Sequence, residues 1–149
     1  RLVRSTSRMR VFTLISVISL AVMAQGLTEK QKEKIRTIHA ECQADPATNV
    51  DEALLKKAYN NEPAEGPQLR AHVLCMSKKL GLQKDNGDLD KDTLRLQLSR
   101  AISDEAKLNK AVDECGVQKD NPEETAAAIL KCFHDHVGHV LHDHGQHLH

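Results

Sequence analysis

This 149-residue sequence contains two histidine–cysteine pairs whose spacing would allow them to bind a metal ion. His39 lies three residues before Cys42, and His72 lies three residues before Cys75. Because side chains at i and i+3 project from one face of a helix, the two pairs together could hold zinc in a tetrahedral Cys2His2 site. Such a site requires reduced thiolates, and it leaves Cys115 and Cys132 without a role.

The amino-terminal segment bears on the redox state of these thiols. After Met9 and one basic residue, an apolar stretch of about 14 residues runs from Val11 to Ala24, and small residues follow it. This stretch is shorter than the roughly 20 residues that span a membrane, so it is typical of a secretory signal peptide cleaved near Gly26. On this interpretation, the eight residues before Met9 are upstream sequence. The alternative is an amphipathic or anchoring helix that the mature protein retains.

The four cysteines of a secreted chain are more often bridged than catalytic, because the compartment is oxidising. Four cysteines allow three pairings, and spacing alone does not choose among them. Each cysteine lies on or beside the apolar face of a different predicted helix, so any pairing joins helices. Bridges are therefore expected, with the pairing still open on these grounds.

The first three helices that position these residues follow from local start and stop signals. A capping box at 28–31 begins a helix predicted to end near residue 43, and Asn49 begins a short second helix. The third helix ends at Gly81, a residue type that favours the helix C-terminus. Its apolar positions recur at helical spacing: Leu69, Val73, Met76 and Leu80.

Three further helices are predicted in the second half of the chain. The fourth carries Leu94, Leu98, Ala101 and Ile102, although 93–99 also alternates with the period of a strand. The absence of a clear partner strand favours the helix. The fifth covers about 104–115, and the sixth begins at Asn121 with Pro122 in the first helical position. The fold class is therefore all-α.

Several function classes find no support in the sequence. There is no Gly-rich phosphate loop, no G-x-S-x-G and no H-E-x-x-H, and an EF-hand loop centred on Gly87 would have to start at Leu82, which is not a ligand. An enzyme is not expected, nor is a cofactor. Beyond residue 26 the chain holds 17 basic and 21 acidic residues, a net charge of −4 with neutral histidines, which argues against nucleic acid as a partner.

The cysteine pattern resembles that of the insect odorant-binding proteins, of the pheromone-binding and general odorant-binding type. That family usually has six cysteines, with three residues between the second and third and eight between the fifth and sixth. Counting back from Cys75 and Cys132 reaches Ala71 and Glu123 instead. The four cysteines present match positions one, three, four and six, which is the minus-C subgroup. The stretches "VLCMSKKLG", "DECGVQKDNPEETA" and "LKCF" are similar to beetle members, and the likeness covers residues 27–141.

The resemblance implies both a pairing and a function. It pairs Cys42 with Cys75 and Cys115 with Cys132, and it implies six short amphipathic helices that enclose an apolar cavity. The protein would be a secreted carrier of small hydrophobic odorants or pheromones, without a membrane partner in its mature form. An olfactory receptor is a further partner that the family implies. A monomer or a weak dimer is expected, with a helical domain at 27–135 and a tail at 136–149.

The cavity is predicted to be aliphatic, since Tyr59 and Phe133 are the only aromatic residues beyond residue 26. Such a cavity favours flexible aliphatic or terpenoid ligands. The candidate lining residues could each equally be ordinary core; they are Val73, Met76, Leu94, Leu98, Ile102, Leu108, Val112, Ile129 and Phe133.

The tail at 134–149 holds seven of the nine histidines. Val137, Val140 and Leu141 continue the apolar face of Phe133, so the first half of the tail should cover the cavity as a wall or lid. Acidification would charge the histidines, loosen the lid by repulsion and lower ligand affinity.

The histidines also leave other functions open. His136, His139 and His142 recur every three residues and could bind Zn, Cu or Ni ions weakly, without a formed site. A secreted histidine-rich metal-binding protein is therefore one alternative. A lipid or defence carrier in a fluid unrelated to olfaction is another, on the same fold.

Overall fold

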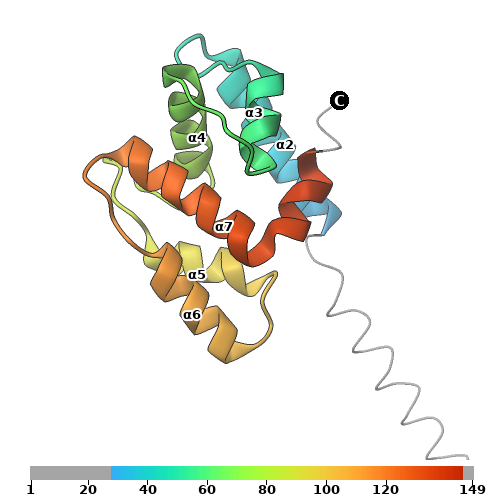
Figure 1. The fold of residues 1–149 in the computed structure, drawn as a ribbon, viewed down its shortest axis with the longest axis vertical. Helices are drawn as coiled ribbons and strands as arrows, with labels where there is room; N and C mark the ends of the chain where they lie inside the picture. Colours follow the sequence, from blue (N-terminus) through green and yellow to red (C-terminus); the bar gives the residue numbers. More distant parts are fainter. Residues whose placement is uncertain (1–27, 146–149) are drawn as a thin grey trace, which may run out of the picture.

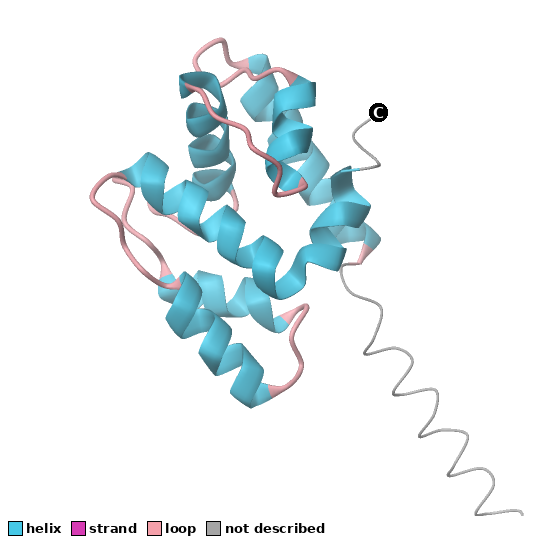
Figure 2. Cartoon of the chain, in the orientation of Figure 1, coloured by secondary structure: helices cyan, strands magenta, loops and turns pink. Residues whose placement is uncertain are grey.

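The computed structural model describes residues 28–145 of the chain, and their side chains as far as Gly138. Within this part the chain forms six helices and no β-strand, so the all-α prediction is confirmed (Figures 1 and 2). The helices are α2 (Glu29–Ala44), α3 (Glu52–Tyr59), α4 (Pro67–Lys79), α5 (Lys91–Ser99), α6 (Glu105–Cys115) and α7 (Pro122–Gly145). The predicted signal peptide and the last four residues of the tail lie outside the described residues.

The predicted starts of the first and the last helix, α2 and α7, are correct. The Thr28 hydroxyl accepts from the Gln31 amide and the Gln31 side chain accepts from the Thr28 amide, which is the expected capping box. At the start of α7 the Asn121 side chain accepts from the Glu124 amide at 2.8 Å. These signals succeed because a cap depends only on residues within one turn of each other.

The predicted start of the second helix is wrong by two residues. Asp51, not Asn49, caps α3, and its carboxylate accepts from the amides of Ala53 and Leu54. The Asn49 side chain instead donates to the Gln43 carbonyl at 2.8 Å, which closes the turn after α2. Both residue types are good caps, so the sequence pattern did not separate them.

The remaining helices follow the predicted pattern with small shifts. α4 begins at Pro67 in the first helical position, two residues before Leu69, and Gly81 follows it with φ of +77°. α5 is a helix rather than a strand, capped by the Asp90 side chain. The segment after α4 is a turn, in which the Lys84 amide donates to the Asp88 carbonyl at 2.8 Å.

Two disulfides join the helices, and their pairing is the one that the family resemblance implied. Cys42–Cys75 ties α2 to α4, and Cys115–Cys132 ties α6 to α7. The Cys2His2 zinc interpretation is therefore wrong, because both of its thiols are consumed in the first bridge.

α7 crosses the centre of the molecule and contacts α3, α4 and α6 (Figure 1). Figure 1 shows α2, α3 and α4 on one side of it and the α5–α6 pair on the other. The helix changes direction at Val137, whose φ of −136° and ψ of 28° are not helical. None of the helices that the structure describes is long and apolar enough to cross a membrane.

Candidate ligand-binding site

A cavity of about 170 Å³ lies inside the helical domain, measured as the space open to the centre of a water molecule. By this measure a single water needs only about 10–15 Å³, so the cavity has room for a molecule much larger than water. Its wall is mainly apolar and comes from every helix except α6. The apolar lining residues are Ile35, Tyr59, Val73, Met76, Leu80, Leu82, Ala101, Ala126, Ile129, Leu130, Phe133 and Val137.

Five of the twelve apolar residues proposed from the sequence lie on this wall. They are Val73 and Met76 of α4 and Ile129, Phe133 and Val137 of α7. Val137 is only 3% exposed, and the kink in α7 occurs at this residue. The kink of α7 therefore lies in the cavity wall, and the lid predicted beyond it stays a prediction. Val140 and Leu141 fall among the residues whose side chains are not described.

The other five proposed residues do not line the cavity. They belong to the hydrophobic core between α5, α6 and α7, which comprises Leu94, Leu98, Ile102, Leu108 and Val112 with Leu82, Ala111, Cys115 and Ile129. The physical reason is that α5 and α6 pack against each other, so their apolar faces are buried by one another. As ligand contacts, these five residues stay a prediction.

The sequence pattern did not identify α2 as part of the site. Gln31, Ile35 and His39 line the cavity at spacings of four residues, and Lys34 and Arg36 flank them. The signal was present, since Ile35 and His39 stand at i and i+4 beside the buried Ile38.

Two hydroxyl groups interrupt the apolar wall. Burial raises the pKa of Tyr59 to about 12, and the nearby Glu52 carboxylate adds to this, so the phenol stays neutral. Ser77 also lines the cavity, but its Oγ atom is buried and has no hydrogen-bond partner within the described residues.

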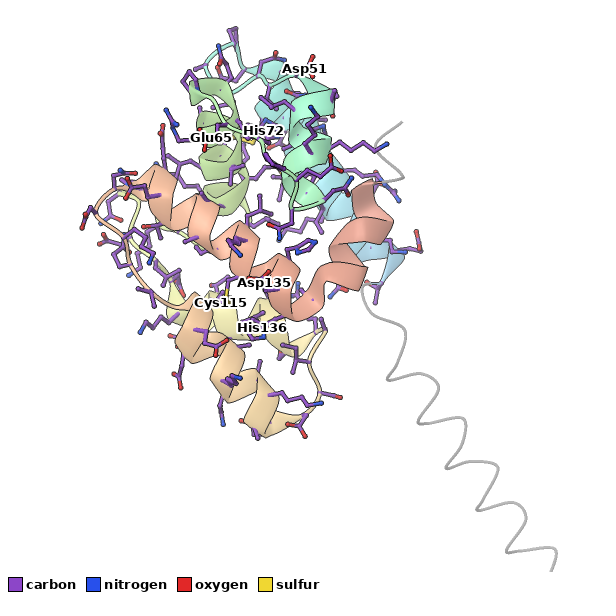
Figure 3. The ribbon with its side chains drawn as sticks, viewed as in Figure 1. Asp51, Glu65, His72, Cys115, Asp135 and His136 are labelled. Carbon is purple, nitrogen blue, oxygen red and sulfur yellow. A yellow bond between two sulfur atoms is a disulfide. The ribbon has the colours of Figure 1, made fainter. Side chains whose placement is uncertain are left out.

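A network of polar side chains joins α2, α3 and α4, in which His39 and His72 are buried and Glu52 is exposed. His39 Nδ1 is 3.2 Å from His72 Nε2, and His39 Nε2 is 2.9 Å from a Glu52 carboxylate oxygen. His72 Nδ1 donates to the Thr48 carbonyl at 2.8 Å. Burial lowers the pKa of His72 below its usual value, and the adjacent His39 adds to this effect. Figure 3 labels His72 on α4.

The described histidines of the tail do not form a metal site. The sulfur atoms of Cys115 and Cys132 lie close to a ring nitrogen of His136, but both sulfurs are bonded to each other. His136 Nε2 instead lies 2.8 Å from a carboxylate oxygen of Glu114 (His136 is labelled in Figure 3). His139 and His142 fall among the residues whose side chains are not described, so their proposed weak metal binding stays a prediction.

A disulfide-linked all-α domain around an apolar cavity defines a binding protein for small molecules. The chain matches the model of the PBP/GOBP family over residues 24–136, and it belongs to this family. Four cysteines in two bridges fit the minus-C subgroup. The resemblance to the pheromone-binding and general odorant-binding proteins is thereby confirmed.

Relatives of known name are found in insects. The chain is 34% identical to the B2 protein of Tenebrio molitor over 113 residues, 76% of this chain and 87% of that protein. It is 31% identical to the B1 protein of the same beetle, over 79% of this chain and 89% of that protein. Odorant-binding protein 10 of Aedes aegypti is 28% identical over 64% of this chain and 69% of that protein.

Proposed function

We propose that the protein is a secreted carrier that takes small hydrophobic ligands into its cavity and transports them through aqueous fluid. The observation that carries the proposal is the apolar cavity walled by α2, α4 and α7. A ligand gains roughly 25 cal/mol for each Å² of apolar surface removed from water, which is enough for micromolar binding of a ten- to fifteen-carbon molecule. The family supports this use, since the Aedes relative is named for odorant binding.

The composition of the wall supports aliphatic rather than aromatic ligands. Tyr59 and Phe133 are the only aromatic side chains on it, so stacking contributes little to binding. Flexible aliphatic or terpenoid molecules with at most one polar group fit such a wall. The proposed activity is binding rather than catalysis. The carrier would act either in olfaction or in a secreted fluid that is unrelated to olfaction.

A displacement assay tests the carrier function. The oxidised protein is loaded with a fluorescent apolar probe, N-phenyl-1-naphthylamine, and titrated with aliphatic and aromatic compounds of equal carbon count. We expect the aliphatic series to displace the probe at lower concentrations. A consistent advantage of small aromatic compounds would contradict the proposed ligand class. Failure of every aliphatic compound to bind, by displacement or by native mass spectrometry, would contradict the carrier function. Native mass spectrometry of the secreted protein would show a co-purified lipid directly.

A further inference from the structure

The opening of the cavity differs in charge from its interior. Three basic residues, Lys34, Arg36 and Arg100, line the cavity, and none of its lining residues is acidic. Lys34 and Arg100 are exposed and Arg36 is half-buried, whereas the lining residues of α4 and α7 are buried or half-buried. The three charges therefore lie where the cavity meets solvent, and they form what we term the basic rim.

Two of the three charges on the basic rim have no counter-ion within the described residues. Arg36 is paired, since its Nη1 lies 2.8 Å from a carboxylate oxygen of Glu33. Arg100 Nη1 donates to the neutral Gln97 side chain at 2.8 Å, which leaves its charge uncompensated. Among the residues that the structure describes, Lys34 has no ion-pair partner. A cavity with an apolar interior and unpaired cations at its opening is complementary to an amphiphilic anion. The interior suits the alkyl chain, and the cations suit the charged head group.

We propose that this cavity binds long-chain carboxylic acids, with the alkyl chain inside and the carboxylate at the basic rim. The proposal rests on the carrier function above and narrows its ligand class. A carboxylate is ionised above about pH 5, and a guanidinium can bind both of its oxygens through parallel hydrogen bonds. The Gln31 and Gln97 side chains also line the cavity and supply neutral amide groups.

The opposite orientation, with the ligand head deep in the cavity, does not suit an acid. The polar groups on the inner wall are the hydroxyls of Ser77 and Tyr59 and the ring of His39, whose two nitrogens already face His72 and Glu52. Burying an ionised carboxylate there is costly, because two neutral hydroxyls replace little of its lost hydration. At the basic rim the head keeps part of its hydration, so the cost of desolvation is small. An alcohol gains nothing comparable at the rim, since it carries no charge.

The test compares three ligands that share one alkyl chain. Dodecanoic acid, 1-dodecanol and methyl dodecanoate are used to displace N-phenyl-1-naphthylamine from the oxidised protein at pH 7.5 and low salt. We expect the acid to have an inhibition constant about five- to tenfold below those of the alcohol and the ester. The variant Lys34→Gln with Arg100→Gln should lose this advantage, so that the acid binds no more tightly than the alcohol.

A matched variant controls for net charge. Lys57→Gln with Lys107→Gln removes two exposed lysines that do not line the cavity, and it should keep the preference for the acid. Equal binding of all three ligands, or a preference that survives in the rim variant, would overturn the proposed carboxylate site while the carrier function stands. Failure of the probe and of all three ligands to bind would overturn both.

Discussion

The Nδ1 atom of His39 lies 3.2 Å from the Nε2 atom of His72, and this contact joins α2 to α4 in the buried interior. Because His72 Nδ1 donates to the Thr48 carbonyl, neutral His72 offers Nε2 as an acceptor. His39 must then donate from Nδ1, while its Nε2 faces Glu52 at 2.9 Å. A second proton on His72 would place one N–H against another.

This geometry predicts that His72 makes the fold less stable in acid. Burial, helped by His39, lowers the pKa of His72 below 6.5, although the Thr48 hydrogen bond and Glu52 oppose the shift. Unfolded His72 takes up its proton near 6.5 and folded His72 only at lower pH. The unfolded state therefore binds more protons below 6.5, and the free energy of unfolding falls as the pH decreases through this value.

The substitution His72→Asn tests this dependence, since asparagine keeps a donor for Thr48 and does not titrate. We expect it to lower the unfolding free energy by about 1–3 kcal/mol at pH 7.5, because His39 loses its acceptor. It should also reduce the decrease in unfolding free energy between pH 7.5 and pH 5, as measured by chemical denaturation. The control His136→Asn alters a partly exposed histidine and should leave that loss in place. An unchanged loss in His72→Asn would contradict the prediction.

Ser77→Ala should not destabilise the protein. The Ser77 hydroxyl is buried without a partner, and alanine is the better helix former, so we expect a gain of about 0.5–1.5 kcal/mol in the unfolding free energy. Thermal denaturation of the ligand-free protein measures this gain. A clear loss of stability would show that the hydroxyl has a bound partner in solution.

Val137→Ala should weaken ligand binding, because Val137 is 3% exposed and lines the cavity at the kink of α7. Removal of two methyl groups from a buried wall costs about 1–2 kcal/mol, or roughly five- to thirtyfold in affinity. The matched control is Val117→Ala, in which the same change is made at a residue that is 46% exposed and outside the cavity. Equal effects of the two substitutions on affinity in the displacement assay would show that Val137 does not contact the ligand.

The described part of the tail places each of its two histidines beside an acid: His136 lies 2.8 Å from Glu114, and His134 lies 3.8 Å from Asp135. The repulsion predicted to open the lid in acid is therefore assigned to the histidines beyond Gly138. We expect the full chain to lose more ligand affinity between pH 7.5 and 5 than a chain that ends at Gly138 and keeps Val137. Equal losses of ligand affinity in the two proteins would contradict the predicted lid.

The missing third disulfide of the family should be restorable. An ion pair now stands at this place, with Arg70 Nε 3.4 Å from a carboxylate oxygen of Glu123. Both side chains are exposed, so the pair contributes at most about 1 kcal/mol. Ala71→Cys with Glu123→Cys should form a bridge between α4 and α7, detected by peptide mapping, and add about 2–4 kcal/mol. Glu123→Ala alone should change stability by less than about 1 kcal/mol, and a double variant that keeps free thiols would contradict the prediction.

Local features of this fold were predictable from sequence, and pairwise features were not. Thr28 with Gln31 and Asn121 with Glu124 set helix starts through contacts within one turn. Leu98 and Ile129 have the same apolar periodicity, yet one is enclosed between α5 and α6 and the other also faces the cavity, because partners are chosen by tertiary packing.

His39 and His72 show the same limit in another form. Each histidine stands one turn from a cysteine of the bridge between α2 and α4, and the two rings meet in the structure. The zinc alternative for these pairs is wrong, since the two sulfurs bond to each other and leave the two imidazoles as hydrogen-bond partners. The oxidised state of the cysteines is what excludes the zinc site.

Tyr59 gives the protein an optical reporter of its own cavity. The chain contains no tryptophan and a single tyrosine, so its emission excited beyond the absorption of phenylalanine comes from this one phenol. Tyr59 lines the cavity, and its pKa of about 12 keeps the ring in one protonation state through the physiological range. A ligand that enters the cavity changes the surroundings of this one fluorescent ring. Occupancy can therefore be followed from unlabelled protein, without a background from aromatic residues elsewhere in the fold.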